Sequence, residues 1–330
     1  MRHRILSFLT GLCLATPLAA QCVGSNLITA LPAAEQAALR ARADLQPFAN
    51  GNFWRASRGD EVIHIIGTYH FDDPRHDATM AILAPVLASA QTLLVEAGPE
   101  EEAALIARMS AEPSLMINTD GPTLPQLLPP AEWQRLSEAL NNRGIPPFMA
   151  AKFRPWYLSM MLSIPPCDIE LAATAKGLDG LLIDAAIAQG LNVKALEPYD
   201  TIFGIFGAMT VADQLAMITS TLALEDKSTD MSITLADTYF AQESRLIWEF
   251  TRDLTQKLPG TTPEQVEKDF TVMEEALMKK RNRAWIPVIE AAAAQGPVLV
   301  GFGALHLSGE AGVLNLLADQ GYEIDLLPLK

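Results

Sequence analysis

The segment "IIGTYHFDDPRHDATMAILAPVLASAQTLLVE" (65–96) has a counterpart near the end of the chain, "LVGFGALHLSGEAGVLNLLADQGYEIDLLP" (299–328). Each contains, in the same order, an apolar strand, a Gly-x-x-His sequence, a short polar loop, an amphipathic helix and a second strand. Strands that alternate with helices are typical of a sheet covered by helices on both faces. The two segments therefore predict an α/β fold with a mainly parallel central sheet flanked by helices.

The rest of the chain adds a hairpin, more helices and one more strand. Residues 53–66 predict an antiparallel hairpin, because two strand-like runs flank a polar turn. Residues 100–165 read as mainly helical, and residues 177–197 as a helix followed by a strand. The pattern from about 208 to 294 is helical throughout and predicts a helical insertion. No Gly/Ser-rich linker divides the chain, so we expect a single domain over 21–330 with a helical subdomain at about 208–294.

The two Gly-x-x-His sequences place His70 after Gly67 and His306 after Gly303. Glycine lets the chain turn sharply at a strand end, and the carboxyl ends of strands in open α/β sheets form the crevice where ligands bind. Glu96 ends the strand that follows the first unit and is expected at the same edge. Two imidazoles and one carboxylate are a common ligand set for a catalytic divalent metal.

Other residues near the first motif have simpler interpretations. A single histidine at a strand end is more often a core or surface residue than a ligand, but two in matching contexts, among four histidines after residue 20, favour a functional site. We interpret His64 as a core residue and His76 as a solvated loop residue. Asp72 and Asp73 could add metal ligands or cap the following helix.

Composition and the first residues indicate an exported globular protein. Of the 330 residues 49% are hydrophobic, and the net charge of −15 argues against a nucleic-acid partner. Arg2 and Arg4 precede the apolar run "ILSFLTGLCLA" and small residues suited to cleavage after Ala20, which predicts a signal peptide at 1–20 and a periplasmic location. No later stretch is long and apolar enough to predict a transmembrane span.

Two cysteines follow the predicted cleavage site, Cys22 and Cys167. A lipid anchor on Cys22 is disfavoured, because Gln21 stands where a lipoprotein signal has Gly or Ala. Export favours a disulfide between the two cysteines, and the alternative is a pair of free buried thiols.

Five sequence blocks resemble the TraB/GumN family, which includes the Tiki-type metalloproteases. They are "GTYH" (67–70), "LLVEAGPE" (93–100), "GLDGLLIDAAIAQGLNVKALEP" (177–198), "KKRNRAWIPVIEAA" (279–292) and "VLVGFGALHLSGEAGVLNLLADQGYEI" (298–324). The resemblance implies an α/β core related to the erythromycin esterase and haem-binding ChaN-like folds. It also implies metal-dependent hydrolysis of peptide or protein substrates, with manganese, cobalt or zinc as the divalent metal.

Carried over by position, the resemblance puts His70, Glu96 and His306 around the metal. The "RN" pair is Arg281 and Asn282, which we expect to stabilise an anion, and the alternative is a helix-surface pair or an Arg tied to a structural carboxylate.

Two further acidic residues of the blocks, Asp179 and Glu197, are expected to support the ligands or the fold. Either Glu96 or Glu197 would accept a proton from water. Two rival interpretations remain: a non-catalytic haem- or metal-binding protein, and an esterase or polysaccharide-related enzyme.

Overall fold

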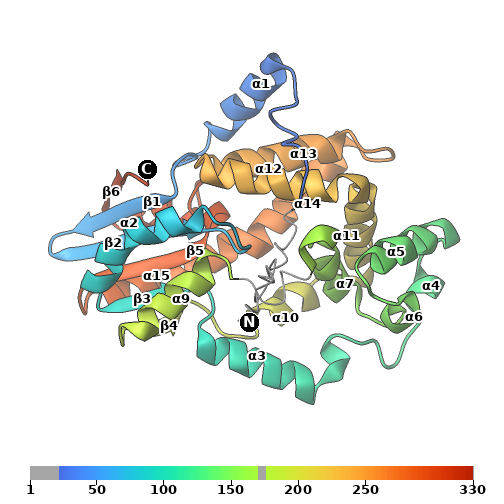
Figure 1. Cartoon of the computed structure of the whole chain (residues 1–330), viewed down its shortest axis with the longest axis horizontal. Coiled ribbons are helices and arrows are strands. Elements are labelled where there is room, and N and C mark those ends of the chain that lie inside the picture. The colour runs from blue at the N-terminus through green and yellow to red at the C-terminus, as the bar shows by residue number, and fades with distance from the viewer. Residues whose placement is uncertain (1–21, 170–175, 330) are drawn as a thin grey trace, which may run out of the picture.

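The computed structural model describes residues 22–169 and 176–329 (Figure 1). Six strands form one sheet in the order β4-β3-β5-β2-β1-β6. Strand β1 is antiparallel to β2 and β6, whereas β2–β5, β5–β3 and β3–β4 are parallel pairs. The strands are β1 Phe53–Arg58, β2 Glu61–Thr68, β3 Thr92–Val95, β4 Asn192–Ala195, β5 Val298–Gly303 and β6 Glu323–Leu326.

Helices surround this sheet and also form the part of the molecule on the right of Figure 1, which confirms the α/β class. The α-helices are α1 Ala33–Ala43, α2 His76–Ser89, α3 Pro99–Ala111, α4 Leu124–Leu127, α5 Pro130–Asn142, α6 Pro147–Ala150, α7 Pro155–Leu162, α9 Leu178–Ala188, α10 Thr201–Gly207, α11 Val211–Ala223, α12 Ser228–Phe240, α13 Ser244–Gln256, α14 Pro263–Glu274, α15 Lys280–Ala293 and α16 Val313–Asp319. Short helical turns are η1 Pro113–Leu115, η2 Pro166–Asp168, η3 Glu225–Lys227, η5 Ala304–His306 and the π-helical η4 Glu275–Lys279.

Two apolar layers hold helices against opposite faces of the sheet. Leu87 of α2 and Leu182 of α9 pack on one face, and Trp285 of α15 and Leu314 of α16 pack on the other. All four side chains are buried, and each contributes about 1.5–3 kcal/mol by leaving water. Helix α15 is thereby fixed on the sheet, and the position of its first turn relative to the strand ends is set by this packing.

The predicted hairpin is confirmed, with a turn at Gly59 (φ +58°) between β1 and β2. His64 differs from the expectation, because it is only half-buried and stacks on Phe53 at 6.2 Å instead of lying in the core. Strand residues alternate between faces, so Ile63 and Ile65 enter the core layer under α15 while His64 points the other way.

The expectation for His76 was wrong. Its side chain is buried, and Nε2 donates a hydrogen bond to the carbonyl of Phe71 at 3.0 Å. Tyr239 and Phe240 of α12 pack against the ring, so a helix distant in sequence covers a loop that looks polar by composition.

The described elements between 208 and 294 are all helical, as the pattern predicts. Helix α11 packs with α4, α5 and α7 through Leu136, Leu158 and Ile218 and so joins helices from both halves of the chain. A separate subdomain at 208–294 stays a prediction.

The predicted signal peptide at 1–20 lies outside the described residues. Within 22–169 and 176–329, no single helix has the length and apolar character to cross a membrane. Helices α10 and α11 meet those criteria only when taken together, and the chain bends by 100° between them.

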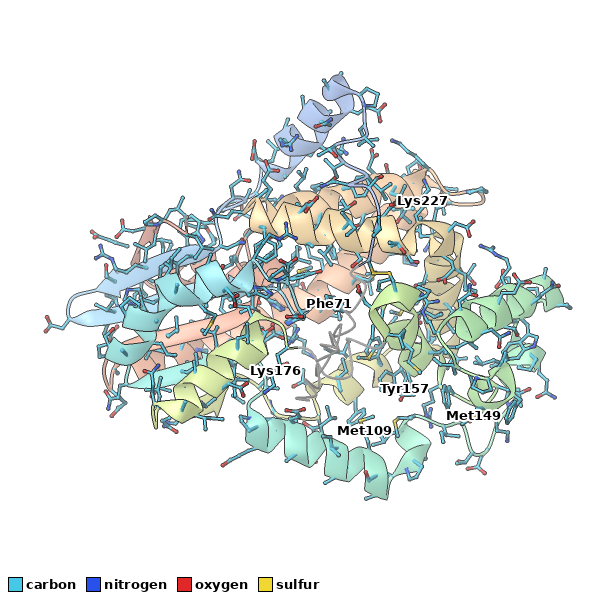
Figure 2. All side chains as sticks on the ribbon, in the orientation of Figure 1. Phe71, Met109, Met149, Tyr157, Lys176 and Lys227 are labelled. Carbon is cyan, nitrogen blue, oxygen red and sulfur yellow. A yellow bond between two sulfur atoms is a disulfide. The ribbon has the colours of Figure 1, made fainter. Side chains whose placement is uncertain are left out.

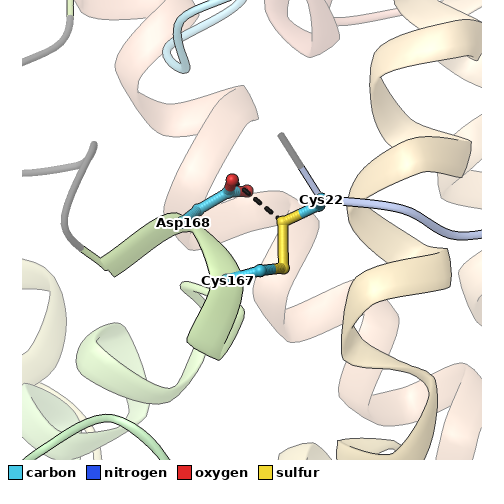
Figure 3. A group of neighbouring side chains, drawn as sticks. All are labelled: Cys22, Cys167 and Asp168. Carbon is cyan, nitrogen blue, oxygen red and sulfur yellow. Dashed lines mark hydrogen bonds between the residues drawn. A yellow bond between two sulfur atoms is a disulfide. The ribbon is translucent and has the colours of Figure 1, made fainter. Parts of the chain in front are cut away.

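A disulfide joins Cys22 to Cys167, with their Cα atoms 5.4 Å apart, and confirms the favoured pairing (Figure 3). A carboxylate oxygen of Asp168 lies 2.9 Å from the Cys22 sulfur. An oxidised sulfur has no proton to donate and is not a thiolate ligand. These three side chains are close enough together to resemble a metal-binding cluster, but the disulfide excludes that interpretation.

Candidate functional site at the strand ends

The candidate site lies where four parallel strands end. His70 follows β2, Glu96 follows β3, Glu197 follows β4 and His306 follows β5 in the turn η5. These strands are neighbours in the order β4-β3-β5-β2, so their carboxyl ends share one edge of the sheet. Figure 2 shows Phe71, the residue after His70, between the sheet and the helical part of the molecule.

Arg281 connects most of these groups. Its Nη2 donates to Glu96 at 2.6 Å and to Glu197 at 2.7 Å, and its Nε donates to the other oxygen of Glu197 at 2.8 Å. Its Nη1 donates to the carbonyl of Leu277 at 3.0 Å and faces Nε2 of His306 at 3.2 Å. The guanidinium therefore joins two carboxylates and one imidazole from three different strand ends.

Local helix geometry explains how Arg281 reaches this position. It lies in the first turn of α15, directly after the π-helical turn at Glu275–Lys279, and π-helical turns often occur at functional sites. The guanidinium lies over the ring of Trp285, one helical turn later, at 4.9 Å. The Trp285 indole N–H donates to Glu197 at 3.0 Å, so one helix face holds both partners of this carboxylate.

His306 is buried, and Asn282 fixes its orientation. Nδ1 of His306 donates to the Asn282 side-chain oxygen at 2.5 Å, while the amide nitrogen of Asn282 donates to the carbonyl of Ala311 at 2.8 Å. With Nδ1 protonated, Nε2 carries the lone pair of the neutral ring. Burial and the nearby charge of Arg281 outweigh the attraction of Glu96 and lower the pKa of His306 to about 4, so the ring is neutral at pH 7.

His70, like His306, is held through its Nδ1 atom. Its Nδ1 donates to Asp179 at 2.8 Å, and the Thr68 hydroxyl donates to the other Asp179 oxygen. A methyl group on Gly303 would lie 3.0 Å from Nε2 of His70 and 3.3 Å from Glu96, so this nitrogen and the carboxylate both border the space next to the same glycine. Gly177 is required nearby, because a Cβ there would be 2.3 Å from the His70 carbonyl carbon.

The pKa values of His70 and Glu96 are strongly shifted from their ordinary values. Burial lowers the pKa of His70, but the Asp179 carboxylate and Glu96 outweigh it and raise the pKa to about 9. Burial alone would raise the pKa of Glu96. Positive charge on His306 (when protonated), Arg281 and His70 outweighs burial and lowers this pKa to about 2. The amide of Gly303 also donates to Glu96 at 2.7 Å. At neutral pH the site therefore holds an ionised Glu96 beside a protonated His70.

The donor atoms at the site, imidazole nitrogens and a carboxylate, are of types that bind divalent metals. Each imidazole is held through Nδ1 by an oxygen acceptor and presents Nε2, which is how metal-ligating histidines are usually oriented. Glu96 supplies a carboxylate, 3.9 Å from Nε2 of His306. The donor atoms of His70, Glu96 and His306 are not all within 4.8 Å of one another. Within the described ranges, the group of acidic, histidine or cysteine side chains that meets this spacing is Cys22, Cys167 and Asp168. Because Arg281 contacts Nε2 of His306 and His70 is protonated at neutral pH, a metal held by both histidines requires Arg281 to release Nε2 of His306 and His70 to lose its Nε2 proton.

The other candidates of the first motif lie outside this arrangement. Asp73 is engaged by Arg75, whose side chain contacts it at 2.7 Å and whose backbone N–H donates to it at 2.9 Å. It orders the turn before α2. Asp72 is exposed on the wall of a neighbouring cavity. Neither is held toward Glu96.

Sequence reasoning missed two contributors to the site. Thr68 holds the second oxygen of Asp179, and no local pattern marks it. Trp285 holds Glu197 and lies under Arg281, and its spacing of four residues from Arg281 on a predicted helix was a usable signal.

The partnership of Asp179 with His70 can be tested by titration. In metal-free protein we expect Asp179→Asn to lower the pKa of His70 from about 9 toward its ordinary 6.5, because Glu96 alone then opposes the effect of burial. A raised pKa stabilises the folded state fully below pH 6.5 and is lost as pH rises through 9. NMR titration of the histidine signals, assigned with His70→Ala, measures this shift. Identical curves for the two proteins would contradict the pairing.

Comparison with protein families gives a match over residues 52–326 to the model described as the TraB/PrgY/gumN family. The matched range contains all the residues of the candidate site. No curated protein matches the chain.

Proposed function

The chain belongs to the TraB/PrgY/gumN family, and from this premise we propose that it is a metal-dependent hydrolase that acts on peptides or proteins. One observation carries the proposal: two imidazoles, each held through Nδ1, lie at the same sheet edge as the ionised Glu96, which is 3.9 Å from Nε2 of His306. His70, Glu96 and His306 would hold the ion. A bound manganese, cobalt or zinc ion would lower the pKa of a water molecule and polarise the scissile carbonyl.

Arg281 and Glu197 would assist the reaction without binding the metal. Arg281 stabilises negative charge that develops on the substrate, because its guanidinium is the one cation that already contacts Glu96 and His306 among the side chains of the described site. Glu197 accepts three hydrogen bonds from Arg281 and Trp285, so it positions the guanidinium and is a poor proton acceptor. Glu96 likewise accepts hydrogen bonds from Arg281 and Gly303 and has its pKa lowered to about 2, so it is also a weak base, and both carboxylates remain candidates for proton transfer.

Asn282 has a different part from the one expected. It is only 1% exposed, and its amide is used by Ala311 and His306. It orients the imidazole and does not reach a substrate. The expected pair of anion stabilisers is thus reduced to Arg281.

Elemental analysis of protein purified without chelators tests the metal site. We expect about one divalent ion per chain in the wild type and none in His70→Ala, because loss of one of three ligands abolishes tight binding. The His70 side chain is 58% exposed, so its loss leaves no cavity in the core, but its pairing with Asp179 stabilises the fold below pH 9. The unfolding midpoint is therefore compared above that pH, where it should change little.

His64→Ala is the matched control, since this half-buried histidine lies outside the site and its variant should keep the ion. A His70→Ala protein with the wild-type metal content would show that the ligands are elsewhere. Hydrolysis is then assayed with unstructured peptides and with simple esters, each with and without added metal. Cleavage of esters alone would favour the esterase alternative.

Haem binding is the second candidate, and one observation favours it. An apolar cavity of about 320 Å³ is bounded by His70 and His306, and such a cavity with an imidazole suits a haem ligand. A Soret band in purified protein that is lost in His306→Ala would support this alternative.

Export is proposed on two grounds. The leader-like first twenty residues favour secretion, and a disulfide between Cys22 and Cys167 persists in an oxidising compartment. Fractionation of cells that make the full chain should recover it in the periplasm, and cytoplasmic recovery would contradict the proposal.

A further inference from the structure

The cavity next to the candidate site is lined mainly by apolar side chains. Its volume is about 320 Å³, and His70, Arg281 and His306 border it. It lies under helices α12 and α13 and the π-helical turn before α15. The apolar wall consists of Leu235, Ile247, Trp248, Leu277, Met278 and Leu305.

We propose that this cavity is a specificity pocket for a large apolar side chain, of leucine, methionine or phenylalanine, next to the scissile bond of a peptide substrate. The inference rests on the proposed function and names its substrate class. A volume of 320 Å³ is at the lower end of the range of small-ligand pockets, about 300–1,000 Å³, and fits one large side chain with a short piece of backbone.

The charge of the wall selects against polar side chains. The charged group that lines the cavity besides the histidines is Arg281, and its donors are engaged by Glu96 and Glu197. A cationic or amide side chain would lose its hydration here without gaining a partner, whereas burial of leucine or phenylalanine is favourable.

Trp248 contributes an aromatic ring to the wall. Its indole N–H is fully buried and therefore not open to the cavity, so this side chain offers no donor to a polar group bound there.

A second cavity lets the substrate chain continue past His70. Its volume is about 470 Å³, and it shares Tyr69, His70 and Phe71 with the apolar cavity. Its wall is more polar and includes Asp72 and Asp168. The two cavities thus adjoin at His70, as an extended peptide that passes the site would require.

Binding to metal-free protein separates this inference from the proposed function. Blocked pentapeptides Gly-Gly-X-Gly-Gly, with X as Phe, Leu, Gly, Asp or Lys, are titrated by calorimetry. We expect Phe and Leu to bind about tenfold or more tightly than Gly or Lys, whereas Asp can pair with the protonated His70 and serves to measure that contribution. Equal affinities, or no binding of any peptide, would overturn the inference. If the protein prefers Phe and Leu but neither retains metal nor hydrolyses peptides, the result would support the apolar pocket and contradict the proposed hydrolase function.

A filling substitution locates the binding. Leu235→Trp, at a partly buried wall position, should remove the preference for Phe and Leu, while a matched Val272→Trp on the exposed side of α14 should keep it. Leu305→Asp is a second test, expected to turn the preference toward Lys. Circular dichroism confirms that the variants are folded. Retained preference in both wall variants, or a Soret band of added haem that Leu235→Trp abolishes, would overturn the assignment.

Discussion

Arg281→Met should lower the free energy of unfolding of the metal-free protein by about 3 kcal/mol at pH 7, at the lower end of the range for breaking a buried ion pair. The substitution keeps an unbranched apolar stem but removes the guanidinium, which leaves Glu96 and Glu197 without their shared cation. The lower end is appropriate because the three side chains keep 15–20% of their surface exposed. Urea unfolding measures the difference.

The same helix provides a matched control. Arg283 pairs with Glu275 across the surface, with 52% of each side chain exposed. Exposed pairs contribute about 0–1 kcal/mol, so Arg283→Met should change stability little. Equal losses in the two variants would show that the guanidinium of Arg281 does not hold the carboxylates of the site together.

The pH dependence of this loss has a defined sign. The pKa of Glu96 is lowered to about 2 from an ordinary 4.5, so its contribution to stability is present above pH 4.5 and is lost as pH falls toward 2. The penalty of Arg281→Met should therefore be largest above pH 5 and shrink in acid. Added manganese should stabilise the variant more than the wild type, because the ion replaces the missing cation without displacing Arg281.

The sequence could predict the parts of the site that depend on local chain geometry. His70, Glu96 and His306 each come within three residues of a strand end, and the repeated Gly-x-x-His pattern marks two of them. Strand ends in a parallel sheet share an edge, so the presence of these groups at one edge follows from topology. The hairpin at 53–66 could be predicted for the same reason, since its strands and turn are contiguous.

Contacts between distant elements could not be predicted in this way. The link from Arg281 to Glu96 and Glu197 depends on where α15 packs across the sheet, which is set by buried residues such as Trp285. The burial of His76 likewise depends on α12. Periodicity predicts which face of a helix is apolar, but it does not give the position at which that face meets a neighbour.

Burial also changes which histidine substitution is informative. From sequence, alanine at either histidine should remove metal without affecting thermal unfolding. His306, however, is buried against Trp285, and its loss leaves the Asn282 oxygen without its donor. We therefore expect His306→Ala to be destabilised as well, by about 1–3 kcal/mol. His70→Ala remains the clean test of the metal site.

Removal of the disulfide is expected to have the other large effect on stability. The Cys22→Ser/Cys167→Ser double variant should unfold with a free energy lower by about 2–5 kcal/mol, because the bridge closes a long loop and restricts the unfolded chain. The two cysteines are 145 residues apart in sequence. The native fold should persist, since Ile28 is buried and the backbone of Leu27 donates to Thr234 at 2.8 Å.

Reduction of the wild type provides the control for this variant. Dithiothreitol should lower the stability of the wild type to nearly that of the double variant and leave the double variant unchanged. The two should be similar in stability, because a Cys22 thiol and a serine hydroxyl at position 22 can each donate to the nearby Asp168 carboxylate. Equal stability of the oxidised wild type and the double variant would mean that the bridge does not constrain the chain, and the N-terminal arm would then be held by its packing against α12 and α13 alone.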